Sequence, residues 1–187
     1  MKKIDLHIHT ISTFSDYNFT FSLETFRRYV EESSLDAVAV TNHDVFDVDQ
    51  FKEIQNALNT VVFPGIEINV AKGHVLIIGC ATHLDDFEAK AKVVSQKITK
   101  IGDFLSVEEL IAIYGDLDKY LVIPHYDKSP PIRGEALEQL RPYICAGEVD
   151  SAKKFVRSIK DITKPTPVLF SDSRMKDDLQ RFPNRQS

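Results

Sequence analysis

The sequence predicts an α/β fold in which seven strands form a largely parallel sheet, either open or closed into a barrel. Short β-branched runs alternate with amphipathic stretches along the chain, and this order favours parallel strands joined by helices. Residues suited to capping helices precede several of the amphipathic stretches. The chain has 187 residues, 43% of them hydrophobic, which is enough for one domain with a sizeable core.

The seven candidate strands are runs rich in Val and Ile, bounded by polar or turn-forming residues. Only a short segment containing Lys72 and Gly73 separates the third from the fourth, which predicts an antiparallel β-hairpin at this point. The strands are expected at residues 4–9, 37–41, 61–70, 75–80, 120–124, 144–149 and 168–170.

Helices are expected where apolar residues recur at helical spacing, as Leu23, Phe26 and Val30 do. They are expected at residues 22–33, 48–58, 85–97, 106–114, 134–140 and 151–159. The candidate N-caps are Ser22, Asp47, Ser106 with Glu109 in a capping box, and Asp150-Ser151.

Composition excludes several classes of protein. A net charge of −5 disfavours a nucleic-acid binder held by net charge alone. No run approaches the roughly 18 apolar residues that a membrane-spanning helix needs, and residues 1–5 lack the apolar stretch of a signal peptide. We therefore expect a cytoplasmic protein that has no membrane partner.

Two further expectations concern the cysteines and the end of the chain. Cys80 and Cys145 lie far apart in apolar stretches, so we expect buried free thiols and no disulfide. Residues 1–175 are expected to form the domain, and residues 176–187 a tail or the start of a linker.

Histidines gather at the ends of the predicted strands. In Asp5-Leu6-His7-Ile8-His9, alternation predicts that Asp5, His7 and His9 share one face of the first strand, opposite Leu6 and Ile8. Two imidazoles placed in this way can chelate one ion, whereas a pair of hydrogen-bonded core histidines is the alternative for this motif alone. Five of the six histidines lie at or beside strand ends: His7, His9, His43, His74 and His125.

Carboxylates occupy other strand ends, notably Glu67 near the end of the third strand and Asp172 after the seventh. Histidine and carboxylate are ligands of Zn²⁺, Mn²⁺ or Fe²⁺ in hydrolytic sites, where the ion lowers the pKa of water and polarises a phosphoryl oxygen. If these strand ends converge, more than one ion binds, with Glu67 between two ions about 3.5–4 Å apart.

The order of these motifs resembles that of the polymerase and histidinol phosphatase (PHP) superfamily. The motifs are HIH, a Ser-Asp soon after it, TNHD, GIEI, GH, PH and a final SD, and the match runs from residue 4 to about residue 175. The resemblance implies a distorted seven-stranded, TIM-like β/α barrel with two or three divalent ions at the carboxyl ends of its strands, and hydrolysis of phosphate esters.

The resemblance also implies a ligand set for each ion. The implied ligands of the first ion are His7, His9, Glu67 and Asp172, and those of the second are Glu67, His74 and His125. Asp16 and His43 match two ligands of a third site.

The chain departs from the family pattern two residues after Asp172. A third histidine ligand is normal there, whereas this motif reads Ser171-Asp172-Ser173-Arg174. Arginine has no lone pair to offer a metal. We expect a weak or empty third site and an Arg174 that binds the substrate phosphate bidentately; the alternative is a solvent-exposed Arg174 beside a decayed cluster.

Two aspartates are further candidates for a role in the site. Asp16 and Asp44 join Arg174 as candidate catalytic residues; Asp44 either orients His43 or caps a turn.

Three residues of the later strand ends complete the candidates. Lys128 and Arg133, in the loop after the fifth strand, either bind the substrate phosphate or are solvated loop charges. Glu148 either reaches the pocket or leads into the next helix.

These expectations together describe a metal-dependent phosphoesterase that uses metal-activated water. A nucleotide or short nucleic acid is the preferred substrate, and a small-molecule phosphatase of histidinol-phosphatase type is the first alternative. The chain also resembles the N-terminal PHP modules of ATPase-linked proteins, so an ATPase domain or partner chain is expected outside this sequence, which has no GxxxxGK loop. A non-catalytic metal-binding module with a regulatory or interaction role is the alternative from another class.

Overall fold

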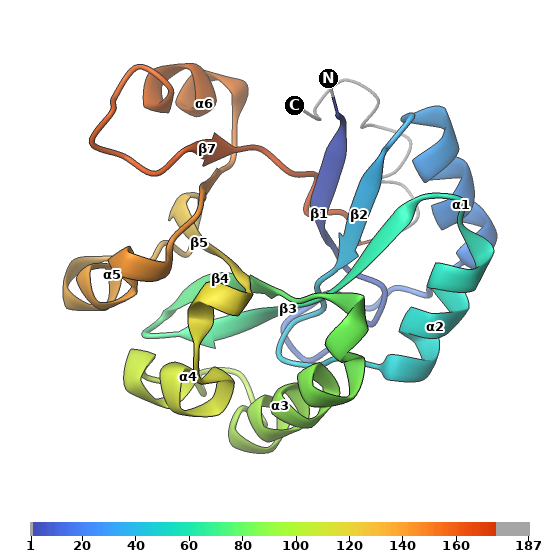
Figure 1. Ribbon diagram of the computed structural model, residues 1–187, viewed down its shortest axis with the longest axis horizontal. Coiled ribbons are helices and arrows are strands. Elements are labelled where there is room, and N and C mark those ends of the chain that lie inside the picture. The colour runs from blue at the N-terminus through green and yellow to red at the C-terminus, as the bar shows by residue number, and fades with distance from the viewer. Residues whose placement is uncertain (1, 175–187) are drawn as a thin grey trace.

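The computed structural model describes residues 2–174, which form one curled seven-stranded sheet with helices on its outer side (Figure 1). The strands follow one another across the sheet in chain order. They are β1 (Ile4–Ile8), β2 (Ala37–Val40), β3 (Val61–Val70), β4 (Gly73–Ile78), β5 (Leu121–Asp127), β6 (Gly147–Val149) and β7 (Pro167–Val168). All seven expected strands are thus confirmed, apart from small differences at their ends.

The six α-helices of the described residues also match the expected ones. They are α1 (Leu23–Glu32), α2 (Val48–Ala57), α3 (Leu84–Lys97), α4 (Val107–Tyr114), α5 (Gly134–Leu140) and α6 (Ala152–Ser158). Three single turns of 3-10 helix occur as well, η1 (Ala81–His83), η2 (Leu117–Lys119) and η3 (Arg141–Tyr143). Caps form at Ser22, Asp47, Ser106 and Ser151, and Ser106 makes the complete capping box with Glu109.

Strand direction determines which loops share an edge of the sheet. β1, β2 and β3 are parallel, β4 runs antiparallel to both β3 and β5, and β5, β6 and β7 are again parallel. The β3–β4 pair is the expected hairpin. Because β4 is reversed, its first residues lie at the same edge as the carboxyl ends of the other strands.

The barrel expected from the family resemblance is formed only in part. After β7 the chain returns to β1, where Ile8 and Ser173 make an isolated parallel bridge and the His9 amide donates to the Ser173 carbonyl at 2.8 Å. β7 has only two residues, so no continuous ladder joins it to β1. Residues 2–174 thus form a curled half-barrel and not a full TIM barrel.

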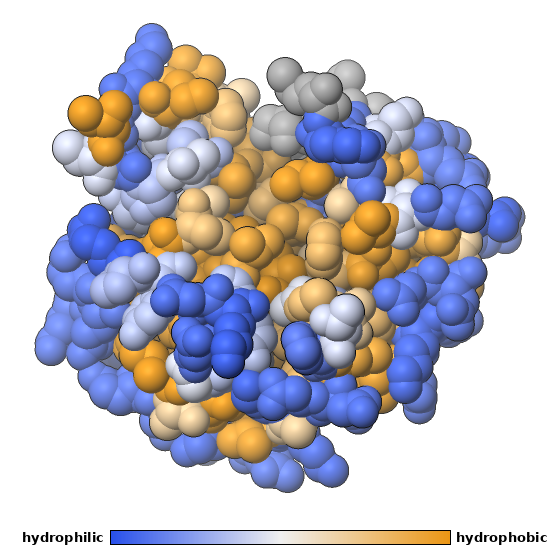
Figure 2. Space-filling view, viewed as in Figure 1, coloured by the Kyte–Doolittle hydropathy of each residue, from blue (hydrophilic) through white to orange (hydrophobic). Residues whose placement is uncertain are grey.

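Three apolar clusters hold the sheet and helices together. An inner cluster, which includes Leu6, Ala39, Leu76 and Ile123, lies on the concave side of the sheet and draws on β1, β2, β4 and β5. A second packs α1 and α2 on β1 and β2, and a third packs α3, α4 and α5 on β3 and β4. Figure 2 shows apolar residues toward the middle of one face and hydrophilic residues around its rim.

A β-bulge in β1 interrupts the alternation of side chains that the sequence predicts. Between Asp5 and Ile8, β1 has one more residue than its partner β2, since Asp5 pairs with Val38 and Ile8 with Val40. Asp5 therefore faces α1, where it accepts a 2.6 Å hydrogen bond from the Tyr29 hydroxyl, and Ile8 packs in the cluster of α1 and α2. The prediction that Asp5 shares a face with His7 and His9 is wrong, because the bulge separates them.

The expectation of buried thiols is also wrong. Cys80 and Cys145 are both free and exposed, because each lies in a connecting segment two residues outside its neighbouring strand. Within residues 2–174, none of the helices has the length and apolar character needed to cross a bilayer. The predicted tail at residues 176–187 lies outside the described residues.

Leu76 tests the inner cluster. Its side chain is fully buried, so Leu76→Ala is expected to lower the free energy of unfolding by about 2–5 kcal/mol through lost burial and a residual cavity. Urea unfolding followed by circular dichroism measures this. The control is Leu121→Ala on neighbouring β5, where the side chain is 43% exposed and the loss is expected to be much smaller. Equal losses would show that the concave side is not a packed core.

Candidate metal centre

The carboxyl edge of the half-barrel carries a cluster of imidazoles and carboxylates. We call it the His–carboxylate cluster; its members lie in five of the seven strands or in the segments that follow β1, β2 and β7. They are His7, His9, Asp16, His43, Glu67, His74, His125, Glu148 and Asp172, and they fall into overlapping groups whose ligand atoms lie within 4.8 Å of one another.

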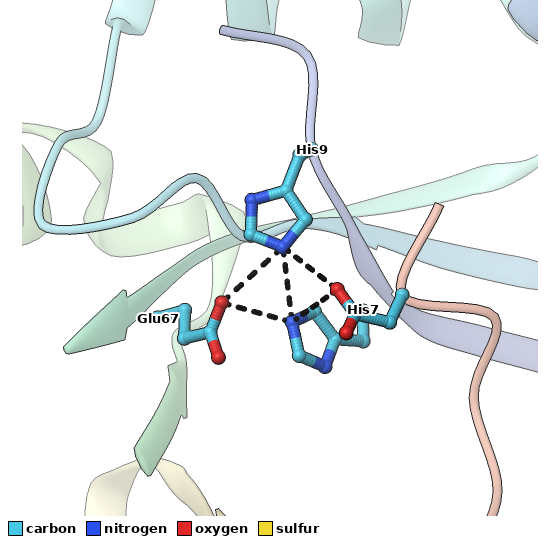
Figure 3. A group of neighbouring side chains, drawn as sticks. His7, His9 and Glu67 are labelled. Carbon is cyan, nitrogen blue, oxygen red and sulfur yellow. Dashed lines mark hydrogen bonds and ion pairs between the residues drawn. The ribbon is translucent and has the colours of Figure 1, made fainter. Parts of the chain in front are cut away.

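The end of β1 supplies the first group. The Nε2 atoms of His7 and His9 are 3.1 Å apart, and each lies close to Glu67 Oε2, at 3.0 and 3.2 Å. Asp172 Oδ1 is 3.1 Å from His9 Nε2. Figure 3 shows the two imidazoles and the Glu67 carboxylate pointing toward one another. Ligand atoms about 2.0–2.1 Å from one ion are themselves separated by distances of this size.

Glu67 faces a different set of partners with its other oxygen. Glu67 Oε1 lies 2.6 Å from His74 Nδ1 and 3.0 Å from His125 Nε2. His74 reaches this point because β4 is antiparallel, and His125 because β5 ends here. The two oxygens of one carboxylate therefore face the two ligand sets that the family resemblance implies.

The nitrogen lone pairs provide a test of whether the cluster fits a metal. His125 Nε2 is buried and lies 3.0 Å from Glu67 Oε1, yet it makes no hydrogen bond within the described part of the chain. This contact has a hydrogen-bond distance without a hydrogen-bond direction. Buried polar atoms rarely lack a partner, so this arrangement fits atoms that converge on an ion.

Glu148 and Lys128 lie deeper in the site than their sequence positions indicated. Glu148 is fully buried, and its carboxylate lies 2.9 Å from His7 Nδ1, which directs the opposite ring nitrogen into the cluster. Lys128 is buried too, with Nζ 2.8 Å from Glu148 and 3.0 Å from Asp172. Lys128 is thus a cation inside the cluster rather than part of an exposed rim.

The electrostatics of the metal-free cluster are those of a site that attracts cations. Burial alone lowers the pKa of His7, yet the carboxylates of Glu148, Asp172 and Glu67 raise it to about 10. Burial alone raises the pKa of Glu67, but the charge of His7 holds it well below its usual range. The carboxylates are therefore ionised and hold a proton on His7.

Arg174 and Asp16 lie at the other side of the cluster. Asp16 Oδ2 accepts from the backbone amide and hydroxyl of Thr13, and Asp16 Oδ1 accepts from Arg174 Nε at 2.7 Å. Arg174 also contacts Asp172 and His43. Its side chain is 17% exposed, so it is neither solvated nor remote from the cluster.

Asp44 and Arg133, two further candidates, do not join the cluster. The Asp44 carboxylate accepts from the backbone amide and side-chain amide of Asn69, at 2.9 and 2.8 Å, and burial raises its pKa to about 7. Asp44 has a left-handed backbone conformation (φ 55°) and fastens the loop that carries His43 onto β3. Arg133 donates to the carbonyls of Tyr126 and Ile132, and its role in binding phosphate stays a prediction.

Comparison with known proteins gives structural matches only. A scan against protein-family models gives no match, and neither does a search of curated protein sequences. A protein from Bifidobacterium adolescentis, inferred to be a metal-dependent phosphoesterase, is similar with a TM-score of 0.57 and 15% identity over 96% of this chain and 94% of that one.

A two-domain protein from Bacteroides vulgatus, which contains an inferred PHP-like metal-dependent phosphoesterase, matches with a TM-score of 0.56 and 18% identity. The match covers 92% of this chain and 52% of the Bacteroides protein, so this chain corresponds to about half of it. The resemblance drawn from the motifs is confirmed at the level of the fold: this chain has the fold of the PHP-like metal-dependent phosphoesterases.

Proposed function

We propose that the protein is a metal-dependent phosphoesterase. The observation that carries the proposal is Glu67, a buried carboxylate whose two oxygens face separate sets of imidazoles. Two ions that share one carboxylate lie at the short separation needed to engage two oxygens of the same phosphate ester. The similar folds of two inferred phosphoesterases support the same reaction class.

His7, His9 and Asp172 would hold one ion with Glu67, and His74 and His125 the other. Divalent ions in such a site lower the pKa of water and offset the charge that develops on the phosphoryl oxygens. Glu148 fixes the ring of His7 through Nδ1, so the nitrogen that faces the cluster does not turn away. Lys128 offsets the charge of Glu148 and Asp172.

A cavity beside the cluster supports a substrate with a ring-bearing organic group. Its volume is about 400 Å³, and His74 is shared between its wall and the cluster. Phe14 and Phe104, 41% and 43% exposed, supply aromatic faces, and Lys72 supplies a cation. Bases stack on such faces, so we propose a nucleotide or the end of a short oligonucleotide as the substrate.

Loss of a ligand tests the proposed reaction. Elemental analysis of the protein loaded with Mn²⁺ is expected to give about two equivalents of metal. His7→Ala is expected to lower this count and to reduce hydrolysis of bis-p-nitrophenyl phosphate by more than about 100-fold. His83→Ala, which changes an exposed histidine outside the cluster, is the matched control and is expected to change neither. Metal binding without ester hydrolysis would instead indicate the non-catalytic metal-binding module, and a protein that binds no metal and hydrolyses no ester would contradict the proposal.

The raised pKa of His7 predicts a pH dependence. In the metal-free protein the carboxylates raise this pKa to about 10, so His7 must release a proton before it can bind an ion. Metal affinity is therefore expected to rise by up to about tenfold per pH unit as the pH increases toward 10. Titration calorimetry at pH 6.5 to 8.5 in buffers of different ionisation enthalpy measures both the affinity and the released protons.

The stability of the metal-free protein is expected to change in the opposite direction. The pKa of His7 is higher in the folded state than its ordinary value of 6.5, so its contribution is fully present below pH 6.5 and is lost as the pH rises toward 10. Metal binding that releases no proton between pH 6.5 and 8.5, or an affinity that falls as the pH rises, would contradict this account of His7.

Phe104 tests the cavity. Phe104→Ala is expected to raise the KM for a nucleotide substrate by about 5- to 150-fold, the effect of about 1–3 kcal/mol of lost stacking. The KM for methyl phosphate is expected to stay the same, because this ester has no ring. Ile101→Ala, at an aliphatic residue of the same wall, is the control. Equal changes for both substrates would contradict a ring-binding role.

A further inference from the structure

One part of the His–carboxylate cluster, the group formed by His9, Asp16 and His43, has the residue types of a metal site, but the positively charged Arg174 side chain lies beside it. His9, Asp16 and His43 offer ligand atoms within 4.8 Å of one another, which is close enough to hold an ion. The Arg174 side chain lies against two of these three residues. The question is whether an ion and the guanidinium can occupy this group together.

The hydrogen bonds that Arg174 donates show that the guanidinium already occupies this group. Arg174 Nε donates to Asp16 Oδ1 at 2.7 Å, and Nη2 donates to His43 Nε2 at 3.1 Å. Asp16 Oδ1 and His43 Nε2 lie 3.8 Å apart. The single lone pair of the neutral His43 ring is engaged by Arg174, so an ion held by these two atoms would have to displace the guanidinium. Arginine stays protonated and has no lone pair of its own, and a divalent ion here would also face an unscreened positive charge.

We propose that Arg174 is a built-in cation that takes the place of an ion at the His9–Asp16–His43 group. This inference rests on the proposed function, because it assumes that ions bind around Glu67. It limits the centre to two ions and makes the third positive group a permanent part of the chain. Metal depletion would therefore remove the two ions and leave this charge in place.

The charges of the cluster agree with a two-ion centre. Four carboxylates, those of Asp16, Glu67, Glu148 and Asp172, face two fixed cations, Lys128 and Arg174. The fixed groups thus leave two negative charges, and two divalent ions convert this to two positive ones. That balance matches a phosphate monoester, which carries about −1.5 to −2 at neutral pH. A third divalent ion beside Arg174 would add a large excess of positive charge.

Arg174 has too few free N–H groups to bind a phosphate through two hydrogen bonds. A guanidinium has five N–H groups. Nε uses one on Asp16, Nη1 donates to both the carbonyl and the carboxylate of Asp172, and Nη2 uses one on His43. One N–H of Nη2 remains for a phosphate oxygen. Arg174 thus acts through its charge and a single hydrogen bond, not through the bidentate contact expected from sequence.

Metal counting tests the proposal without relying on activity. The folded protein is loaded with Mn²⁺, freed of excess ion and analysed for metal per chain, and manganese binding is followed in parallel by calorimetry. The wild type is expected to hold two equivalents. Arg174→His is expected to hold a third, because it removes the cation and supplies an imidazole to the same group. Arg174→Lys is expected to stay at two, because a positive charge remains.

Two further variants keep the test decisive if Arg174→His folds poorly. Asp16→Asn is expected to leave the wild-type count at two, because no ion depends on that carboxylate. Arg157→His makes the same substitution at a 61% exposed arginine outside the cluster and is expected to add no ion.

Each outcome bears on a different claim. Three ions in the wild type, a lower count in Asp16→Asn, or no gain in folded Arg174→His would overturn the role of Arg174 while leaving the phosphoesterase proposal intact. A wild type that binds no ion at all would overturn the proposed function itself.

Discussion

The site depends on one buried carboxylate. Glu67 is 1% exposed, and imidazoles from β1, β4 and β5 contact its two oxygens. An ionised carboxylate is costly to bury unless it is paired, so the surrounding histidines and cations are required for the fold as well as for the chemistry. The antiparallel β4 is part of this arrangement, because a parallel strand would carry His74 to the opposite edge of the sheet.

Charge balance explains why so many polar groups can lie together at the carboxyl edge. Lys128 lies between Glu148 and Asp172, and Arg174 lies between Asp16 and Asp172. The proton on His7 adds a further positive charge while no ion is bound. A proton and a metal ion then compete for one nitrogen, so metal binding, folding stability and pH are linked through the same few residues.

Much of the fold could be predicted from the sequence, because its signals are local. The Val- and Ile-rich runs marked all seven strands, and the polar caps marked the starts of helices. The hairpin followed from its short turn, and the strand-end histidines followed from the rule that parallel strands share an edge. The β1 bulge could not be predicted, because it depends on how Ile4–Ile8 aligns with β2 across the sheet.

The details of the site depended on contacts between residues distant in sequence. Nothing local indicated that Lys128 would be buried against Glu148, 20 residues away, or that Asp44 would bind Asn69 instead of a histidine. Arg174 was recognised as a departure from a motif, but its engagement with Asp16, 158 residues away, required the structure. Sequence therefore identified the ligand types, and the structure showed which charges balance one another.

The central claim is that Glu67 joins two metal ions. Anomalous diffraction from crystals of the protein loaded with Mn²⁺ tests it most directly, because it locates each ion without reference to activity. The account predicts two peaks about 3.5–4 Å apart, one on the His7–His9 side of Glu67 and one on the His74–His125 side. A single peak, or peaks that do not contact Glu67, would contradict it.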